Sequence, residues 1–369
     1  LAGGIPRINS TFDVKIDKLA PLVALGGSGD NATQLKAADN LGSVAFKGTA
    51  QSGTDDLAYD VDLTLAGIGG AGKLSGKITG ISGTPSVDTT LDLRADRPAP
   101  LLQLAGLAGP KAQQMGTLAA KGSLKGGADD LNLDLGLQAA GATAKVAGNI
   151  KAKADPMAFD ISLQANHPEF TQLLALADMP SSGTKAGPLA LNAKASGTTK
   201  KASVSGLDFK WGDSSLTGDA DYDATGAKPM VKASLVGGTV NLVPFMGSGG
   251  GGKQAAAPVP NSGNAPWSNE PLDLSALKGQ DADIDFKANS LIMPDQRIDN
   301  VVAKVTIKDG VMNVDTLTGN IYGGAFNLSG TSVDARTTPQ VAAKIAVDKI
   351  QIGQLLGGGI AGNQLKGPL

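Results

Sequence analysis

His167 is the only histidine in the chain, and the chain has no cysteine. A Ser-His-Asp triad or a zinc site would therefore have to use this one imidazole. Metal ligands occur in clusters, and the sequence offers neither a second histidine nor a thiolate. His167 stands directly before Pro168, where a predicted strand passes into a Leu-rich turn. We expect a surface or capping histidine here, with no catalytic residue and no metal.

Residues 67–72 read GIGGAG, the pattern of a dinucleotide-binding loop, and the following Lys73 brings the segment close to a phosphate-binding loop. Both loops hold phosphate at the N-terminus of a helix. Here residues 74–81 continue as a glycine-spaced strand, and Leu74 stands where Ser or Thr would bind magnesium. The segment predicts a hairpin turn and no nucleotide cofactor. Residues 247–253 repeat the pattern inside a predicted linker.

Three alternate aspartates, Asp281, Asp283 and Asp285, resemble the start of a calcium loop, but Phe286 stands where that loop requires glycine. Alternate residues of a strand project from one face, so we expect three solvated charges. Across the chain no pair of carboxylates is placed as acid and base. An enzyme is therefore the least favoured class.

The composition predicts an all-β protein. Of 34 acidic residues in the 369-residue chain only Glu169 and Glu270 are glutamate, and aspartate suits turns and strand ends better than helices. The chain has 51 glycines and 4% aromatic residues. The net charge of −2, with Lys and Asp interspersed, offers no basic stripe, so nucleic acid is not an expected partner.

Apolar and polar residues alternate in several segments, which places the apolar side chains of each strand on one face. The clearest apolar sets are Leu57, Tyr59, Val61, Leu63 and Leu65; Val87, Thr89, Leu91 and Leu93; and Leu131, Leu133, Leu135 and Leu137. Turn signals at 53–56, 126–130 and 226–229 lie between such segments. Short spacing of this kind is typical of antiparallel meanders, and we expect about 20 strands with no βαβ units.

The sequence also contains a longer repeat, in which a strand is followed by a short Leu-rich helical turn. Its anchors are Leu22, Leu101, Leu173, Phe245 and Leu355, which are separated by 79, 72, 72 and 110 residues. Such repetition favours an elongated stack over one spherical core, on the order of 90 Å long at ~4.8 Å per strand. We expect the short helices to cap an edge of the sheet.

The chain divides into a repetitive antiparallel β region at 1–246, a Gly/Ser/Ala/Pro-rich flexible linker at 247–266 and a C-terminal β region at 267–369. The alternative is a long loop inside one continuous sheet, since strand pairing could resume across 247–266. Two arrangements of the apolar face of the sheet are possible. A second sheet would make a sandwich, whereas a curved sheet would leave a trough that acyl chains can fill.

Several short segments between Pro266 and Gly330 occur in a distinctive order. They are Trp267-Ser268, Pro271 to Leu274, the strand Asp281 to Ala288, Lys308-Asp309-Gly310, and Tyr322-Gly323-Gly324. Their order and spacing resemble the C-terminal region of the AsmA family over these 65 residues. The resemblance implies a periplasm-facing protein at the inner membrane of Gram-negative bacteria, which contributes to outer-membrane assembly and carries phospholipid along an elongated β-groove.

With this resemblance, the preferred fold class is an all-β, elongated, antiparallel repeating β-groove, a curved sheet with a few short helices. The implied partners are phospholipid acyl chains, the inner membrane, and outer-membrane or envelope proteins. No apolar run reaches the 18 residues of a membrane helix. The chain begins with Leu1 and ends at Leu369. We therefore expect a partial segment whose membrane anchor lies upstream and whose C-terminal region is truncated.

The residues expected to line the groove lie in two predicted strands, 281–288 and 301–307. They are Ile284, Phe286, Val301, Val305 and Ile307. Two functions remain open: a conduit for phospholipid, and a structural or adhesive β-repeat protein of the periplasm or cell surface that carries no lipid. Bound phospholipid would distinguish them.

Overall fold

The computed structural model describes residues 7, 9–21, 32–104, 111–179, 181–246, 276–294, 296–336 and 340–350. The structure is 63% strand and 11% helix, which confirms the all-β class that the composition predicted. The strands form open, curved sheet, the fold class preferred with the family resemblance. The chain forms two compact units. The N-terminal unit comprises 1–179 and 186–199, and the C-terminal unit comprises 180–185 and 200–369. The predicted linker, 247–266, lies outside the described residues.

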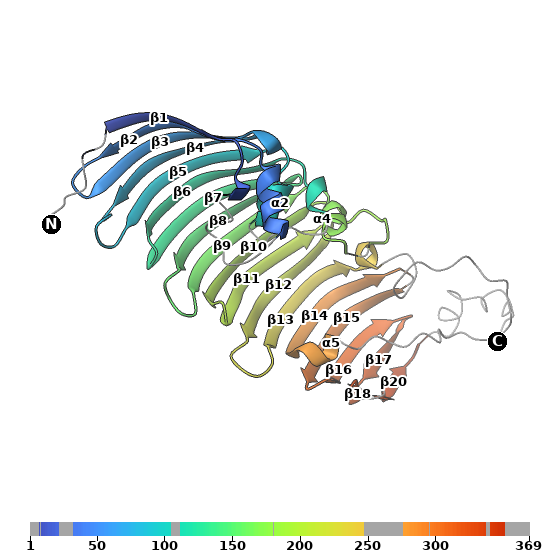
Figure 1. The fold of residues 1–369 in the computed structure, drawn as a ribbon. Helices are drawn as coiled ribbons and strands as arrows, with labels where there is room; N and C mark the ends of the chain where they lie inside the picture. Colours follow the sequence, from blue (N-terminus) through green and yellow to red (C-terminus); the bar gives the residue numbers. More distant parts are fainter. Residues whose placement is uncertain are drawn as a thin grey trace. The chain divides into compact units, whose positions relative to one another are not determined.

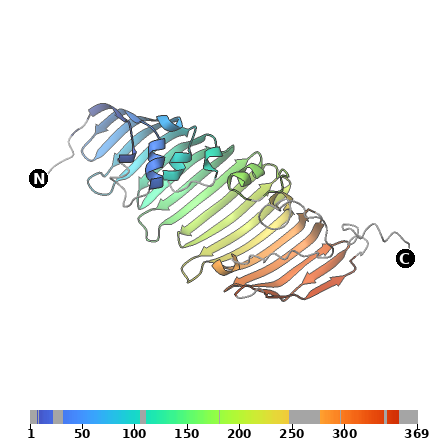
Figure 2. The same cartoon turned by 45° about the vertical axis from the view of Figure 1, so that its right-hand side comes forward.

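The N-terminal unit is a meander of ten strands, each antiparallel to the next (Figures 1 and 2). Their bounds are β1 Asn9–Ile16, β2 Val44–Ser52, β3 Asp56–Leu65, β4 Gly70–Thr79, β5 Ser86–Ala95, β6 Leu118–Gly127, β7 Asp130–Ala139, β8 Ala142–Lys151, β9 Ala158–His167 and β10 Leu189–Thr198. The predicted turns at 53–56 and 126–130 are confirmed as the β2–β3 and β6–β7 connections.

The strand register brings the predicted apolar sets onto one face, here called the inner face. Leu91 of β5 lies opposite Leu74 of β4 and Gly122 of β6. Gly122 in turn lies opposite Leu135 of β7. Because directly opposed residues project from the same side of a sheet, the apolar sets form continuous cross-strand rows.

Glycines on the inner face allow neighbouring strands to approach closely. A Cβ atom added at Gly122 would lie 1.9 Å from the carbonyl oxygen of Asp134, and one added at Gly148 would lie 2.1 Å from that of Asp160. Both glycines have positive φ, 157° and 147°. Glycine at such strand positions permits the bends by which a sheet curls. This accounts for part of the high glycine content.

The short helices of the N-terminal unit all lie at one end of its strands, here called the helix rim; the opposite end, with short turns, is the hairpin rim (Figure 1). The helical segments are α2 Ala32–Asn40, η1 Ala66–Ile68, α3 Ala99–Leu104, η2 Ala112–Gln114 and α4 Phe170–Leu176. A buried cluster of Leu41, Ile68 and Ala95 packs there with Leu101 and Leu104 of α3. The prediction that short helices cap a sheet edge is confirmed.

Four strands separate α3 from α4, and four separate α4 from η3, Val243–Phe245, which explains the predicted repeat. The first set is β6 to β9. Four strands of ten to twelve residues, with their turns, account for most of each 72-residue interval. Helix α2 was not predicted. The first and last anchors, Leu22 and Leu355, lie outside the described residues.

The C-terminal unit contains the remaining strands and one further helix, α5 Ala276–Gly279. The strands are β11 Lys201–Trp211, β12 Ser214–Asp223, β13 Met230–Asn241, β14 Asp281–Met293, β15 Gln296–Lys308, β16 Val311–Ile321, β17 Gly324–Leu328, β18 Thr331–Asp334, β19 Gln340–Ala342 and β20 Ile345–Asp348. The predicted turn at 226–229 connects β12 to β13.

One pairing in this unit corrects the prediction of a purely antiparallel sheet. Strands β13 and β14 are parallel, with Met230 opposite Asp281 and Asn241 opposite Ile292. A parallel pair needs a crossover connection of about a dozen residues or more. The 39 residues between the two strands, 242–280, are long enough for such a connection. Strand pairing thus resumes across the segment that contains the predicted linker.

The turn between β15 and β16 is the predicted two-residue hairpin. Asp309 and Gly310 both have positive φ, 52° and 82°, and Lys308 lies opposite Val311. Asp-Gly is a favoured pair for such a turn, because both of its central residues must adopt positive φ.

We expect Gly310→Val to lower the free energy of unfolding by about 1 kcal/mol or more, because a β-branched residue is strained at positive φ. Added atoms have room, since the nearest neighbour of a Cβ there is Arg336 Cγ at 3.4 Å. Urea unfolding followed by circular dichroism measures the change. Gly226→Val, in a turn without positive φ, is the control and should stay within about 0.5 kcal/mol. Equal effects of both variants would contradict the assignment of strain to Gly310.

Candidate functional site

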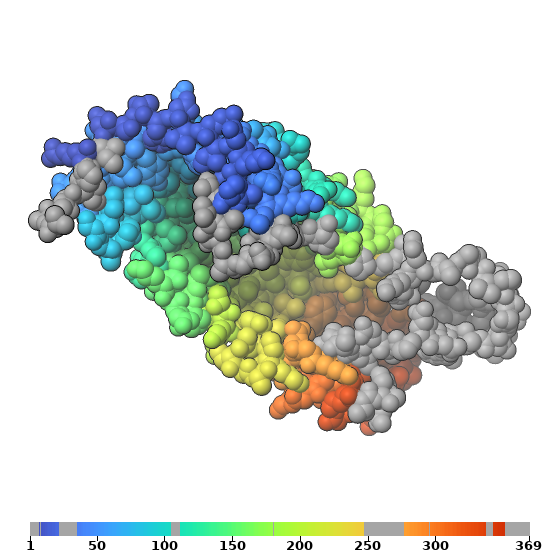
Figure 3. Space-filling model, in the orientation of Figure 1, coloured from blue at the N-terminus to red at the C-terminus, as the bar shows by residue number. Residues whose placement is uncertain are grey.

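The inner face of the N-terminal unit is apolar and only half-buried. Along β7 the inner residues Leu131, Leu133, Leu135 and Leu137 are half-buried, whereas the outer residues between them are exposed. A covering second sheet would have buried these leucines as the core of a sandwich. Figure 3 shows the strands of this unit curving around a hollow. The repeating β-sheet groove is therefore supported over the sandwich.

The outer face of the same unit carries exposed ion pairs between adjacent strands. They are Asp13–Lys47, Asp60–Lys73, Asp56–Lys77, Asp92–Lys121, Asp88–Lys125 and Asp134–Lys145. Exposed pairs of this kind contribute little stability, typically 0–1 kcal/mol each. These pairs make the two faces of the sheet different, because the outer face is charged and the inner face is apolar.

A polar pair on the inner face is satisfied internally. The hydroxyl of Tyr59 on β3 hydrogen-bonds Thr89 Oγ1 on β5, and Thr89 is 6% exposed. A paired hydroxyl offers little unsatisfied hydrogen-bonding capacity to an apolar ligand. The inner surface at this point therefore remains suitable for hydrocarbon.

The C-terminal unit brings the predicted lining residues together. Ile284 lies opposite Val305, and Ile307 and Val301 lie opposite the inner alanines Ala282 and Ala288. Phe286 of β14 faces Leu235 of β13 on one side and Ala303 of β15 on the other. All five predicted residues therefore share one face. Four are half-buried, and Val301 is 3% exposed.

The connection between these two strands is shorter than expected. Leu291 and Ile298, expected in a joining stretch, are opposed residues within the extended strands β14 and β15. Sequence reasoning also missed the apolar partners on β16, where Val314 and Leu317 lie opposite Val305 and Ala303. A register shift between Lys304 and Val305 displaces that pairing, and a bulge of this kind has no simple sequence signal.

His167 has a structural role at the helix rim. It is 2% exposed, and its Nδ1 accepts a hydrogen bond from the Glu169 N–H at 2.9 Å. Its Nε2 lies 2.9 Å from the carbonyl oxygen of Ala140, so Nε2–H donates to that oxygen. The imidazole thus joins the β7–β8 turn to the start of α4. The capping role is confirmed, but the side chain is buried and not at the surface.

Glu169 is the N-cap residue of α4. A single carboxylate oxygen, Oε1, accepts from Thr171 N (3.3 Å) and Oγ1 (2.8 Å), and from the backbone N–H groups of Ala186 (3.0 Å) and Gly187 (3.2 Å). These donors, the Thr171 hydroxyl foremost, lower the pKa of Glu169 below its ordinary value of 4.5. The carboxylate therefore fixes both ends of the α4 connection.

We expect Glu169→Gln to lower the free energy of unfolding at neutral pH by about 1 kcal/mol, the usual effect of weakening an N-cap. Because the pKa of Glu169 is lowered in the folded state, its contribution is present above pH 4.5 and is lost as the pH falls through the folded value. The difference between wild type and variant in thermal melting should therefore shrink in acid. A difference that is constant from pH 7 to pH 3 would contradict this role of the charge.

The glycine-rich motif at 67–72 forms no phosphate site. Gly67 and Ile68 belong to η1, Gly69 has a φ of 62°, and strand β4 begins at Gly70. The next element is a strand and not a helix N-terminus, so the predicted hairpin connection is confirmed.

The three aspartates of β14 are not equivalent solvated charges, which corrects that expectation. Asp285 lies 3.9 Å from Lys304, and Asp281 accepts from the Asp309 N–H at 2.9 Å. Asp283 Oδ1 is buried without a hydrogen-bond partner. Within the described residues, no group of three or more His, Cys, Asp or Glu side chains could hold a metal ion.

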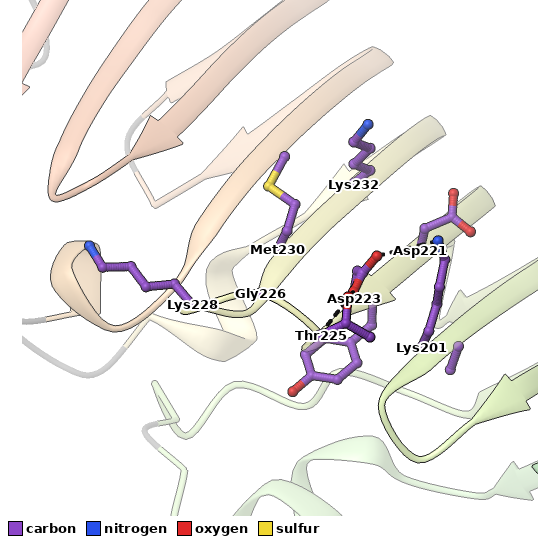
Figure 4. Close-up of a pocket in the computed structure, with 10 residues that line it drawn as sticks. Lys201, Asp221, Asp223, Thr225, Gly226, Lys228, Met230 and Lys232 are labelled. Atoms are coloured by element: carbon purple, nitrogen blue, oxygen red, sulfur yellow. Dashed lines mark hydrogen bonds and ion pairs between the residues drawn. The ribbon is translucent and has the colours of Figure 1, made fainter. Parts of the chain in front are cut away.

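A pocket of about 510 Å³, lined in part by Lys and Asp side chains, lies beside the β12–β13 turn (Figure 4). Lys201 lies 3.3 Å from Asp223, and Lys228 lies 3.0 Å from Asp309. The hydroxyl of Thr225 is the main cause that lowers the pKa of Asp223 to about 2, followed by the Thr225 N–H and Lys201. An aspartate held ionised in this way is suited to an ion pair and poorly suited to general acid–base catalysis at neutral pH.

No helix in the described part of the chain is long and apolar enough to cross a membrane. Comparisons with curated proteins and with solved structures gave no match. A comparison with protein-family models matched residues 253–368, the segment that contains β14 to β20 and every predicted lining residue. The model matched is that of the AsmA family, which confirms the resemblance seen in the sequence for this C-terminal segment.

Proposed function

We propose that this chain is a non-enzymatic segment that conducts phospholipid along its apolar inner face and thereby contributes to outer-membrane assembly. Acyl chains lie against the inner face, and headgroups stay in water. The location that goes with this function is the periplasmic side of the inner membrane, with outer-membrane or envelope proteins as further partners.

The observation that carries the proposal is the apolar inner face, which is half-buried along β7 of the N-terminal unit and at four of the five predicted lining residues of the C-terminal unit. Each methylene removed from water contributes ~0.8 kcal/mol, so an acyl chain gains binding energy along its whole length. No single residue has to hold the lipid. Fluid chains also fill an irregular lining of alternating leucine and glycine, which rigid side chains would leave partly void.

The match to the AsmA family supports the general role in the proposal, and the cargo and its path go beyond that match. The AsmA family is associated with the bacterial envelope and with outer-membrane assembly or lipid transport. It is not a known enzyme family. Phospholipid as the cargo, and the inner face as its path, are the finer parts of the proposal.

Mass spectrometry of lipid extracted from the purified chain tests the proposal. We expect phospholipid to remain bound after gel filtration and to exchange into added phosphatidylethanolamine vesicles. A chain that is folded by circular dichroism yet carries no phospholipid, before or after incubation with vesicles, would favour the structural or adhesive alternative.

A further inference from the structure

We infer that the N-terminal unit selects phospholipids by acyl-chain length: headgroups lie at the hairpin rim, and terminal methyl groups abut the helix rim. This inference rests on the proposed function, because it specifies how the proposed cargo lies in the groove. It follows from three features of the unit: a closed end, an open end and the depth between them.

The helix rim closes the groove. On β2, β5 and β9 the last inner residue is buried there: Val44 is 1%, Ala95 is 3% and His167 is 2% exposed. The helical segments cover this row, since Ile68 of η1 and Leu101 of α3 pack in one cluster with Ala95. A methyl end that reaches this covered row can go no further without displacing packed side chains.

The hairpin rim is open and charged. Its connections are short, and residues 53–55 and 128–129 are the whole of two of them. Exposed ion pairs such as Lys153–Asp129, 3.2 Å apart, lie beside these turns. A hydrated, charged rim suits a phospholipid headgroup, which loses its solvation energy if it is drawn into apolar surroundings.

The open depth of the groove corresponds to about one leaflet of a bilayer. On β3 the half-buried inner residues extend from Leu57 to Leu65, and Leu65 packs against the cluster at the helix rim. The part between the rims, from Leu57 to Leu63, spans about 20 Å at ~3.4 Å per residue. One leaflet occupies about half of the ~30 Å hydrocarbon core of a membrane. An acyl chain parallel to the strands therefore fills the groove between its two rims.

Small residues sit where the chain end would lie. Ala120, Ala144 and Ala165 belong to one cross-strand row, through Leu137, two residues from the helix-rim ends of β6, β8 and β9. At those ends His167 is buried, whereas Leu118 and Ala142 are half-buried. All three alanines are half-buried. Larger side chains there should shorten the groove without changing its open end, which makes this row the length-determining position.

The test uses the double variant A144L/A165L, in which the two opposed alanines are enlarged. Wild type and variant are incubated with vesicles of equal amounts of dimyristoyl- and dioleoyl-phosphatidylcholine, and bound lipid is quantified by mass spectrometry. We expect the ratio of bound dimyristoyl to dioleoyl lipid to rise about tenfold, the effect of losing burial of roughly two methylenes.

Two single variants are matched controls. Ala195→Leu enlarges an inner residue of β10 that lies opposite Ile161, toward the hairpin rim, and should leave the ratio unchanged. Thr143→Leu changes the exposed outer neighbour of Ala144 and should also leave it unchanged. A shift caused by Ala195→Leu and not by A144L/A165L would overturn the proposed orientation of the lipid.

If all variants bind phospholipid at the wild-type ratio, the length inference is wrong and the proposed function stands. If even the wild type binds none, the proposed function itself fails. Should A144L/A165L not fold, the wild type alone gives a second test with saturated phosphatidylcholines of increasing length. The affinity of the wild type for these lipids should rise with each added pair of methylenes and then level off as the acyl chain reaches the helix rim. A continued rise with chain length would contradict a closed end.

Discussion

Val305→Asp should reduce the rate of phospholipid transfer between vesicles by the purified chain at least about tenfold, because an unpaired charge in an apolar path costs several kcal/mol to desolvate. Val305 lies between Ile284 on β14 and Val314 on β16, neither of which can pair with a carboxylate. Every acyl chain that slides along this face must pass that position. Transfer from donor to acceptor vesicles, followed with a fluorescent phospholipid, measures the effect.

Val302→Asp is the matched control, since it places the same substitution on the same strand but on the opposite face. Val302 is 38% exposed and lies opposite Lys287, which can pair with the new carboxylate. Transfer should remain near the wild-type rate, with both variants folded by circular dichroism. Equal loss, or equal retention, in the two variants would remove the inner face as the path.

Trp211→Ala should lower the free energy of unfolding by about 3–5 kcal/mol, the cost of truncating a buried tryptophan. Trp211 ends β11, is 4% exposed, and lies with its ring centroid 4.9 Å from that of Phe209 and 5.7 Å from that of Phe245. Its indole N–H donates to the Asn241 carbonyl at 3.1 Å. This aromatic cluster joins η3 to the end of the sheet, in the same way that leucines join α3 to the N-terminal unit.

Trp211→Phe separates packing from hydrogen bonding. It keeps an aromatic ring but leaves the Asn241 carbonyl without its donor, so a smaller loss of about 1–3 kcal/mol is expected. Urea unfolding of both variants gives the two values. A loss below about 1 kcal/mol for Trp211→Ala would show that the cluster contributes little to the C-terminal unit.

The strands could be predicted because their signals are local. Period-two alternation gave the inner residues of β3, β5 and β7, and the short turns then set the register that aligns them. Period-two alternation also gave the lining residues of β14 and β15, which pair directly with each other.

Features that depend on non-local contacts could not be predicted in this way. The parallel pairing of β13 with β14 joins residues 51 positions apart in the chain, beyond any periodic pattern. The sequence around Trp211 does not indicate which residue its side chain contacts. Only the folded structure places Phe245 against it. The buried environment of His167 likewise depends on the β7–β8 turn, where its partner Ala140 lies 27 residues earlier in the chain.

Site-specific photo-crosslinking tests the central claim, that the inner face holds acyl chains, most directly. A photoreactive amino acid is placed at Phe286 or Val305 on the inner face, and at Lys287 or Val302 on the outer face. After incubation with phosphatidylethanolamine vesicles and irradiation, mass spectrometry of the protein should show phospholipid adducts at the two inner positions only. Adducts to protein alone, or lipid adducts at inner and outer positions alike, would contradict a lipid path along the inner face.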